Sequence, residues 1–102
     1  ELVFRYGQTV LDALREVEDA LVALQANEQR VEALERAAGE AREAYRLASV
    51  RYEEGAVDLL TVLDAQRSRL QAEDSLVQAE LARLAAAATL FRALGGSWAQ
   101  DT

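Results

Sequence analysis

The chain has 102 residues, a net charge of −7, 51% apolar and 28% charged residues, and no Cys, His or Pro. It therefore offers no disulfide, thiol nucleophile, imidazole base or zinc finger, and without a basic run it lacks the phosphate-neutralising charge that nucleic acid binding needs. Its bias toward Ala, Glu, Leu and Arg is typical of long helices and coiled coils. We expect an all-α chain with no cofactor, no metal site and no catalytic residue.

Residues 1–54 form the first predicted element, a long amphipathic helix. Apolar residues recur at steps of four and three from Val10 to Leu24 and again from Val31 to Tyr52, which is coiled-coil spacing. Between these runs, the position where the next apolar residue is expected is occupied by Glu28. The pattern therefore predicts that the apolar face shifts around the helix at this point. No N-terminal cap precedes the pattern, and we expect a fragment of a longer protein.

Residues 55–58 form the predicted hairpin turn. Gly55 suits the left-handed position just past a helix end, and Asp58 can cap the next helix by accepting a hydrogen bond from a free backbone N–H. A connection this short makes the two helices antiparallel neighbours. Glu53 and Glu54 lie just before the turn, at the carbonyl end of the helix dipole, where cations are favoured by roughly 0.3–1 kcal/mol. Such a broken local preference often marks a functional site.

Residues 59–94 form the second predicted helix. A seven-residue repeat of large apolar side chains is its clearest feature, with members at Leu63, Leu70, Val77, Leu84 and Phe91, supported by Leu60, Leu81 and Ala88. Gly95 and Gly96 supply the expected C-terminal stop, which leaves residues 95–102 as a tail with Trp98 as its one anchor. The expected fold is a long antiparallel helical hairpin resembling a coiled coil.

A second, partial apolar stripe lies off this seam. Its members are Leu11, Val22, Leu47, Val50, Val62, Leu76 and Leu90. Two helices can bury only one seam, so the second stripe predicts packing partners outside this chain. Alone, the chain is expected to self-associate.

Three separated motifs then resemble one known family. They are QTVLDALREVEDAL (8–21), RYEEGAVDLLTVLDAQRSRLQAE (51–73) and LFRALGGSW (90–98). Their order and spacing resemble the C-terminal repeat of the TolC-like outer-membrane efflux channels, most closely the NodT/OprM-type members. The resemblance covers nearly the whole chain.

The resemblance implies a homotrimer with a β-barrel in the outer membrane and an α-helical barrel in the periplasm. This chain would be one helical pair of that periplasmic barrel. Its turn would be the periplasmic tip, where the channel closes and meets the adaptor, or membrane fusion, protein of a tripartite pump. The inner-membrane pump would supply the energy, so this protein would conduct exported compounds passively.

The same resemblance assigns roles to residues near the turn. It places a pore constriction at Leu60 and Asp64, which lie four apart on one helix face. It places the tip and adaptor contact at Tyr52, Glu53, Glu54, Gly55, Ala56, Val57 and Asp58. TolC itself has an arginine at the position of Val57 and an aspartate at that of Thr61, so its polar latch cannot be copied here.

Plainer readings stay open for each of these residues. Gly55 can be an ordinary turn glycine, Glu53 and Glu54 solvated charges, Asp64 a solvent-facing carboxylate and Tyr52 the last core residue of its helix. An enzyme is not expected, because a two-helix hairpin encloses no pocket that would shift carboxylate pKa values. The alternative function is a stand-alone coiled-coil scaffold or interaction hairpin.

Overall fold

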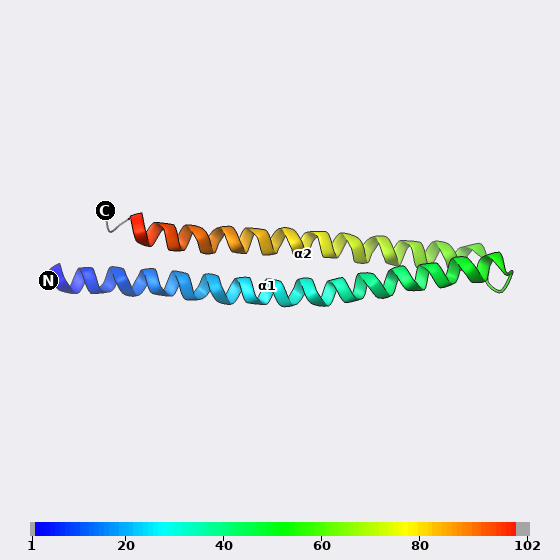
Figure 1. Ribbon diagram of the computed structural model, residues 1–102, viewed down its shortest axis with the longest axis horizontal. Coiled ribbons are helices and arrows are strands. Elements are labelled where there is room, and N and C mark those ends of the chain that lie inside the picture. The colour runs from blue at the N-terminus through cyan, green and yellow to red at the C-terminus, as the bar shows by residue number, and fades with distance from the viewer. Residues whose placement is uncertain (1, 100–102) are drawn as a thin grey trace. The chain divides into compact units, whose positions relative to one another are not determined.

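The computed structural model describes residues 2–99, which form two helices and no strand. Helix α1 spans Leu2–Glu53 and helix α2 spans Leu59–Ala99, joined by a short turn (Figure 1). The all-α helical hairpin expected from the sequence is confirmed.

The predicted stop at Gly95 and Gly96 is wrong, because α2 continues to Ala99. A glycine ends a helix when it takes the left-handed conformation, and Gly95 does not take it. Residues 100–102 of the predicted tail lie outside the described residues.

The chain divides into two compact units, and each contains a piece of both helices. The turn unit comprises residues 29–80, and the end unit comprises residues 2–28 and 81–99. Within each unit the piece of α1 packs on the piece of α2, and each unit is described by itself below.

The face of α1 that packs on α2 follows the same residue spacing in each of the two units. Its buried and half-buried members, again at steps of four and three, are Ala13, Val17, Ala20, Leu24, Asn27, Val31, Leu34, Ala38, Ala41, Tyr45 and Ala48. The predicted shift of the apolar face at Glu28 is therefore wrong, because Asn27 fills the vacant position. Its amide Nδ2 donates to the Ala23 carbonyl at 2.7 Å, so the polar group has a partner. Leu14 and Leu21, predicted in this seam, are exposed instead.

The face of α2 that packs on α1, here called the inner seam, alternates alanines with larger residues. Its members are Val62, Ala65, Arg69, Ala72, Leu76, Ala79, Arg83, Ala86, Leu90 and Ala93. The predicted seven-residue repeat, here called the outer repeat, points away from α1, with exposed fractions from 48% at Leu63 to 73% at Phe91. The sequence pattern predicts both apolar faces of α2, but the prediction of which face packs on α1 is wrong. Val62, Leu76 and Leu90, predicted as a second stripe, lie in the inner seam.

The buried core is correspondingly thin. Among the described residues its apolar members are Ala20, Val31, Ala38, Ala48 and Ala79, and Val31 is the one large side chain that is fully buried. Because the hydrophobic contribution follows the apolar area removed from water, this core stabilises the hairpin weakly.

Polar contacts tie the two helices together in the turn unit. The Arg42 guanidinium donates from Nε to Oε1 of Glu73 at 2.9 Å, and both side chains are partly exposed, so the pair contributes about 0.2–1 kcal/mol. The Arg69 guanidinium carbon lies 4.6 Å from the centre of the Tyr45 ring, within cation–π range. The Nε atom of Arg69 is buried without a hydrogen-bond partner.

Candidate functional site at the hairpin turn

At the end of α1, two backbone N–H groups that follow the helix donate to carbonyls of its last turn. The N–H of Ala56 donates to the Arg51 carbonyl at 2.8 Å, and the N–H of Gly55 donates to the Tyr52 carbonyl at 3.0 Å. Gly55 has φ 77°, a left-handed conformation that costs other residues roughly 1–2 kcal/mol. This is a Schellman motif, and the predicted role of Gly55 as the turn glycine is confirmed.

The start of α2 is capped by Asp58. Its Oδ1 accepts from the Thr61 hydroxyl at 2.8 Å and from the Thr61 backbone N–H at 3.0 Å. These two bonds, the hydroxyl first, hold the pKa of the Asp58 carboxyl below its usual value of 3.8. A hydrogen bond to the ionised form favours that form. The predicted cap is confirmed, and the pair of motifs fixes the turn from both sides.

The two carboxylates before the turn are exposed. Glu53 ends α1, and Glu54 follows it with its N–H bonded to the Val50 carbonyl at 3.1 Å. Arg51 lies in the same last turn and offsets part of their unfavourable interaction with the helix dipole. The carbonyls of Val50, Arg51 and Tyr52 are bonded to backbone N–H groups, and a carboxylate, which only accepts, could not replace these donors.

The predicted constriction residues lie on the exposed surface of α2. Leu60 is 64% exposed, and Asp64, one helical turn further on, is also exposed. Tyr52 at the end of α1 is 45% exposed and so is not the closed-in last core residue that the plainer reading allowed. Within the predicted tip, Val57 alone is half-buried and the other members are exposed. The structure thus brings an apolar and acidic surface together around one rigid turn.

Two features near the turn were missed by sequence reasoning. Leu59 is 51% exposed beside Leu60, so the start of α2 carries two adjacent exposed leucines. The cross-helix pairs Arg42–Glu73 and Tyr45–Arg69 were also missed. Counting back along one helix and forward along the other from the middle of the turn, 55–58, would have matched them to within about half a helical turn, because antiparallel neighbours lie at similar distances from their turn.

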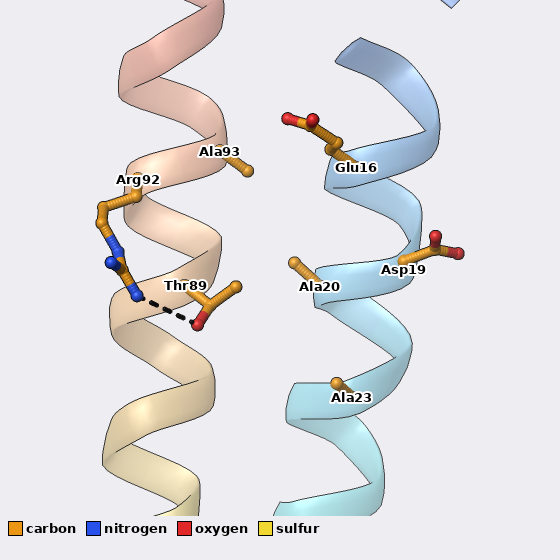
Figure 2. Close-up of a pocket in the computed structure, with 7 residues that line it drawn as sticks. All are labelled: Glu16, Asp19, Ala20, Ala23, Thr89, Arg92 and Ala93. Carbon is orange, nitrogen blue, oxygen red and sulfur yellow. Dashed lines mark hydrogen bonds between the residues drawn. The ribbon is translucent and has the colours of Figure 1, made fainter. Parts of the chain in front are cut away.

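A shallow groove lies between the helices in the end unit (Figure 2). Its lining residues are Glu16, Asp19, Ala20, Ala23, Thr89, Arg92 and Ala93. Ala20 and Ala93 point into the space between the helices, and the Arg92 guanidinium donates to the Thr89 hydroxyl at 3.5 Å (Figure 2). The groove exists because alanines fill little volume. It also brings residues of the first sequence motif, 8–21, opposite residues of the third, 90–98.

Comparison with known proteins identifies the family. The model of the family described as outer membrane efflux protein matches residues 2–96. The chain belongs to this family.

Curated relatives of this efflux family agree along the whole chain. The pyoverdine export outer membrane protein OpmQ of Pseudomonas putida is 40% identical over 102 residues, all of this chain and 22% of the relative. The outer membrane protein OprJ of Pseudomonas aeruginosa is 42% identical over 96 residues, 94% of this chain and 20% of the relative. The probable efflux pump outer membrane protein TtgC of Pseudomonas putida is 36% identical over 100 residues, 98% of this chain and 21% of the relative.

The chain thus spans about a fifth of the length of the curated relatives it matches. No solved structure matches it. None of the helices in residues 2–99 is long and apolar enough to cross a membrane. The resemblance drawn from the three sequence motifs is confirmed at the level of the family.

Proposed function

We propose that this chain is a periplasmic helical hairpin of an outer-membrane efflux channel. The observation that carries the proposal is the family match over residues 2–96 together with a two-helix hairpin of matching extent. Relatives named as efflux pump outer membrane proteins support a passive conduit that works with a pump. The same match favours the channel over the alternative of a stand-alone scaffold hairpin.

The turn is the proposed tip of the channel. A Schellman motif and an Asp58 cap hold it rigidly, and its side chains are almost all exposed and therefore available to a partner. In a homotrimer, three copies of Leu60 and Asp64 would meet around one axis. A ring of leucines can close a pore by excluding water, and a ring of carboxylates favours cations over anions.

The gate is tested in the full-length trimer by single-channel conductance in planar bilayers. Leu60→Ala and Asp64→Ala are each expected to raise conductance, because each removes part of the narrowest ring. Asp74→Ala is the control, since it removes an exposed carboxylate from the same helix farther from the turn. If neither tip variant differs from the control, Leu60 and Asp64 do not line the constriction.

The acidic rim of Glu53 and Glu54 is the proposed contact for a basic residue of the periplasmic adaptor. Exposed charges of this kind steer association and select partners more than they add affinity. Charge reversal, Glu53→Lys with Glu54→Lys, should weaken adaptor cross-linking several-fold, and the wild-type contact should weaken with added salt. Glu32→Lys with Glu35→Lys makes the same charge change on α1 away from the turn. An equal loss of cross-linking in both double variants would mean that Glu53 and Glu54 are ordinary surface charges and not a specific contact for the adaptor.

A further inference from the structure

Two side-chain contacts on neighbouring turns join α1 to α2 in the turn unit. The Arg69 guanidinium carbon lies 4.6 Å from the centre of the Tyr45 ring, and Nε of Arg42 donates to Oε1 of Glu73 at 2.9 Å. Arg42 and Tyr45 are three residues apart on α1, and Arg69 and Glu73 are four apart on α2, so each pair shares one face of its helix. These four residues are here called the clamp.

The segment between the clamp and the turn, residues 46–68, has little packing of its own. Ala48 is its one buried side chain, and the inner seam of α2 supplies the half-buried Val62 and Ala65. All four leucines of this segment are exposed, by 42% or more. Because alanine side chains form only low ridges, they interlock weakly with a facing helix. Burial alone therefore does little to fix the rotation of α2 about its own axis.

Arg69 is an unusual residue for the inner seam. Its Nε atom is buried without a hydrogen-bond partner, and an unpaired buried donor costs free energy comparable to what a cation–π contact returns. A leucine at this position would bury apolar area without that cost. The contact with Tyr45 therefore adds little net stability. Its value lies in geometry, because a polar or charged seam residue can fix how two helices align.

The position of Arg69 determines which way the start of α2 faces. An α-helix turns by about 100° per residue. Leu60 precedes Arg69 by nine residues, about two and a half turns, and so lies on the opposite side of the helix. Asp64 precedes Arg69 by five residues and lies about 140° away from it. While Arg69 stays on the Tyr45 ring, both residues are directed away from α1, in agreement with their exposure.

We propose that Arg69 and Tyr45 are positioning residues that set the rotation of α2 and thereby hold Leu60 and Asp64 outward. The other pair of the clamp lies farther from the hairpin turn and adds a second point of attachment, because a single contact would let α2 pivot. This inference rests on the function proposed above only where Leu60 and Asp64 are taken to line a pore. The rotation itself is a property of the hairpin.

The reactivity of one introduced cysteine in the full-length trimer measures this rotation. Ala65 is half-buried in the inner seam, about one turn from Arg69, so Ala65→Cys should react slowly with a water-soluble maleimide. Arg69→Met and Tyr45→Leu should each raise the reaction rate about fivefold, the factor that corresponds to the loss of a cation–π contact. Tyr45→Phe keeps an aromatic ring under the guanidinium and should leave the rate unchanged.

A matched control and a double variant show whether the effect belongs to this contact. Arg83 is half-buried at the equivalent inner-seam position two heptads on, in the end unit, and Arg83→Met should leave the rate at position 65 unchanged. Arg69→Met with Tyr45→Leu should raise the rate no further than either single variant, since both remove the same contact. Circular dichroism checks that each variant is folded. An unchanged rate in both single variants, an equal rise in Arg83→Met, or additive effects in the double variant would overturn the positioning role.

Single-channel conductance of the same trimers separates this inference from the proposed gate. If Leu60 and Asp64 line the constriction, Arg69→Met should raise the conductance together with the cysteine reaction rate. A faster reaction with unchanged conductance would keep the positioning role of Arg69 and argue against the gate. An unchanged reaction rate overturns the positioning role whatever the conductance.

Discussion

The two apolar faces of α2 divide the work of packing in an unexpected way. The inner seam, which meets α1, alternates alanine with larger residues such as Leu76 and Arg69, whereas the outer repeat carries Leu, Val and Phe. Small residues let two helices approach closely but bury little area. The large side chains of the outer repeat therefore stay largely exposed in this hairpin.

The largest effect is expected when a buried alanine of the inner seam is replaced by a larger side chain, which tests whether the two faces of α2 differ in packing. Ala79 is fully buried, so Ala79→Leu should lower the free energy of unfolding by about 1–3 kcal/mol through overpacking. Ala85 is exposed on the same helix, and Ala85→Leu should change stability by less than about 0.5 kcal/mol. Urea unfolding followed by circular dichroism measures both. Equal effects would mean that the close approach of the helices does not depend on small residues.

Replacing one leucine by alanine on each face compares how much each face contributes to the stability of the hairpin. Leu76 is half-buried in the inner seam and Leu70 is about half exposed on the outer repeat. In dilute, monomeric protein, Leu76→Ala should cost about 1–2 kcal/mol and Leu70→Ala clearly less, because more of the removed Leu70 area was already in water. The difference between the two stability losses should disappear once neighbours cover the outer repeat. A larger loss for Leu70→Ala in the monomer would contradict the assignment of the faces.

The left-handed conformation of Gly55 lets the chain turn from α1 into α2. A comparison of two glycine substitutions, one in the turn and one inside α1, tests its contribution to stability. Gly55→Ala should destabilise the hairpin by about 1 kcal/mol, because alanine is strained at its positive φ. Gly39→Ala is the matched change inside α1, where nothing lies near the new methyl group, and should stabilise by up to about 1 kcal/mol. Thermal unfolding should therefore move in opposite directions for the two variants. Shifts of the same sign would argue against the left-handed turn.

The smallest effect is a pH dependence at the Asp58 cap. The folded pKa of Asp58 is lowered, so its contribution to stability is fully present above the unfolded value near 3.8 and is lost as the pH falls through the lower folded value. Asp58→Asn keeps a capping side chain without the charge and should remove this dependence. The difference between the two proteins, followed by thermal unfolding, should shrink below pH about 3.8. A constant difference at every pH would mean that ionisation of Asp58 does not support the cap.

The local chemistry of the turn could be predicted from the sequence, but the partner of each helix face could not. Gly55 and Asp58 were placed correctly because turn and cap preferences depend on a few adjacent residues. The large apolar residues of the outer repeat predict the hairpin seam, because such residues are expected inside, yet periodicity gives the angle between faces and not the neighbour that covers each one. Asn27 was overlooked as a seam residue because it is polar, although its amide bonds back to its own helix.

The proposed site was reached by a different route. The turn residues were assigned by resemblance, and the family match extends that support to nearly the whole chain. Exposure of Leu60 and Asp64 is what a pore-lining pair needs, but the other walls of the proposed pore would come from helices outside this chain. The orientation of a side chain toward a symmetry axis depends on those helices.

Among the described residues, the buried core consists of four alanines and one valine, and this has a consequence for the life of the protein in a cell. A segment with so little burial of its own opens locally at a low free-energy cost, and opened backbone is what proteases cleave. In the proposed channel, neighbours would cover the outer repeat of an assembled copy, whereas a copy without them would stay open to degradation. Proteolysis would thereby remove unassembled copies and spare assembled ones, without any dedicated recognition signal.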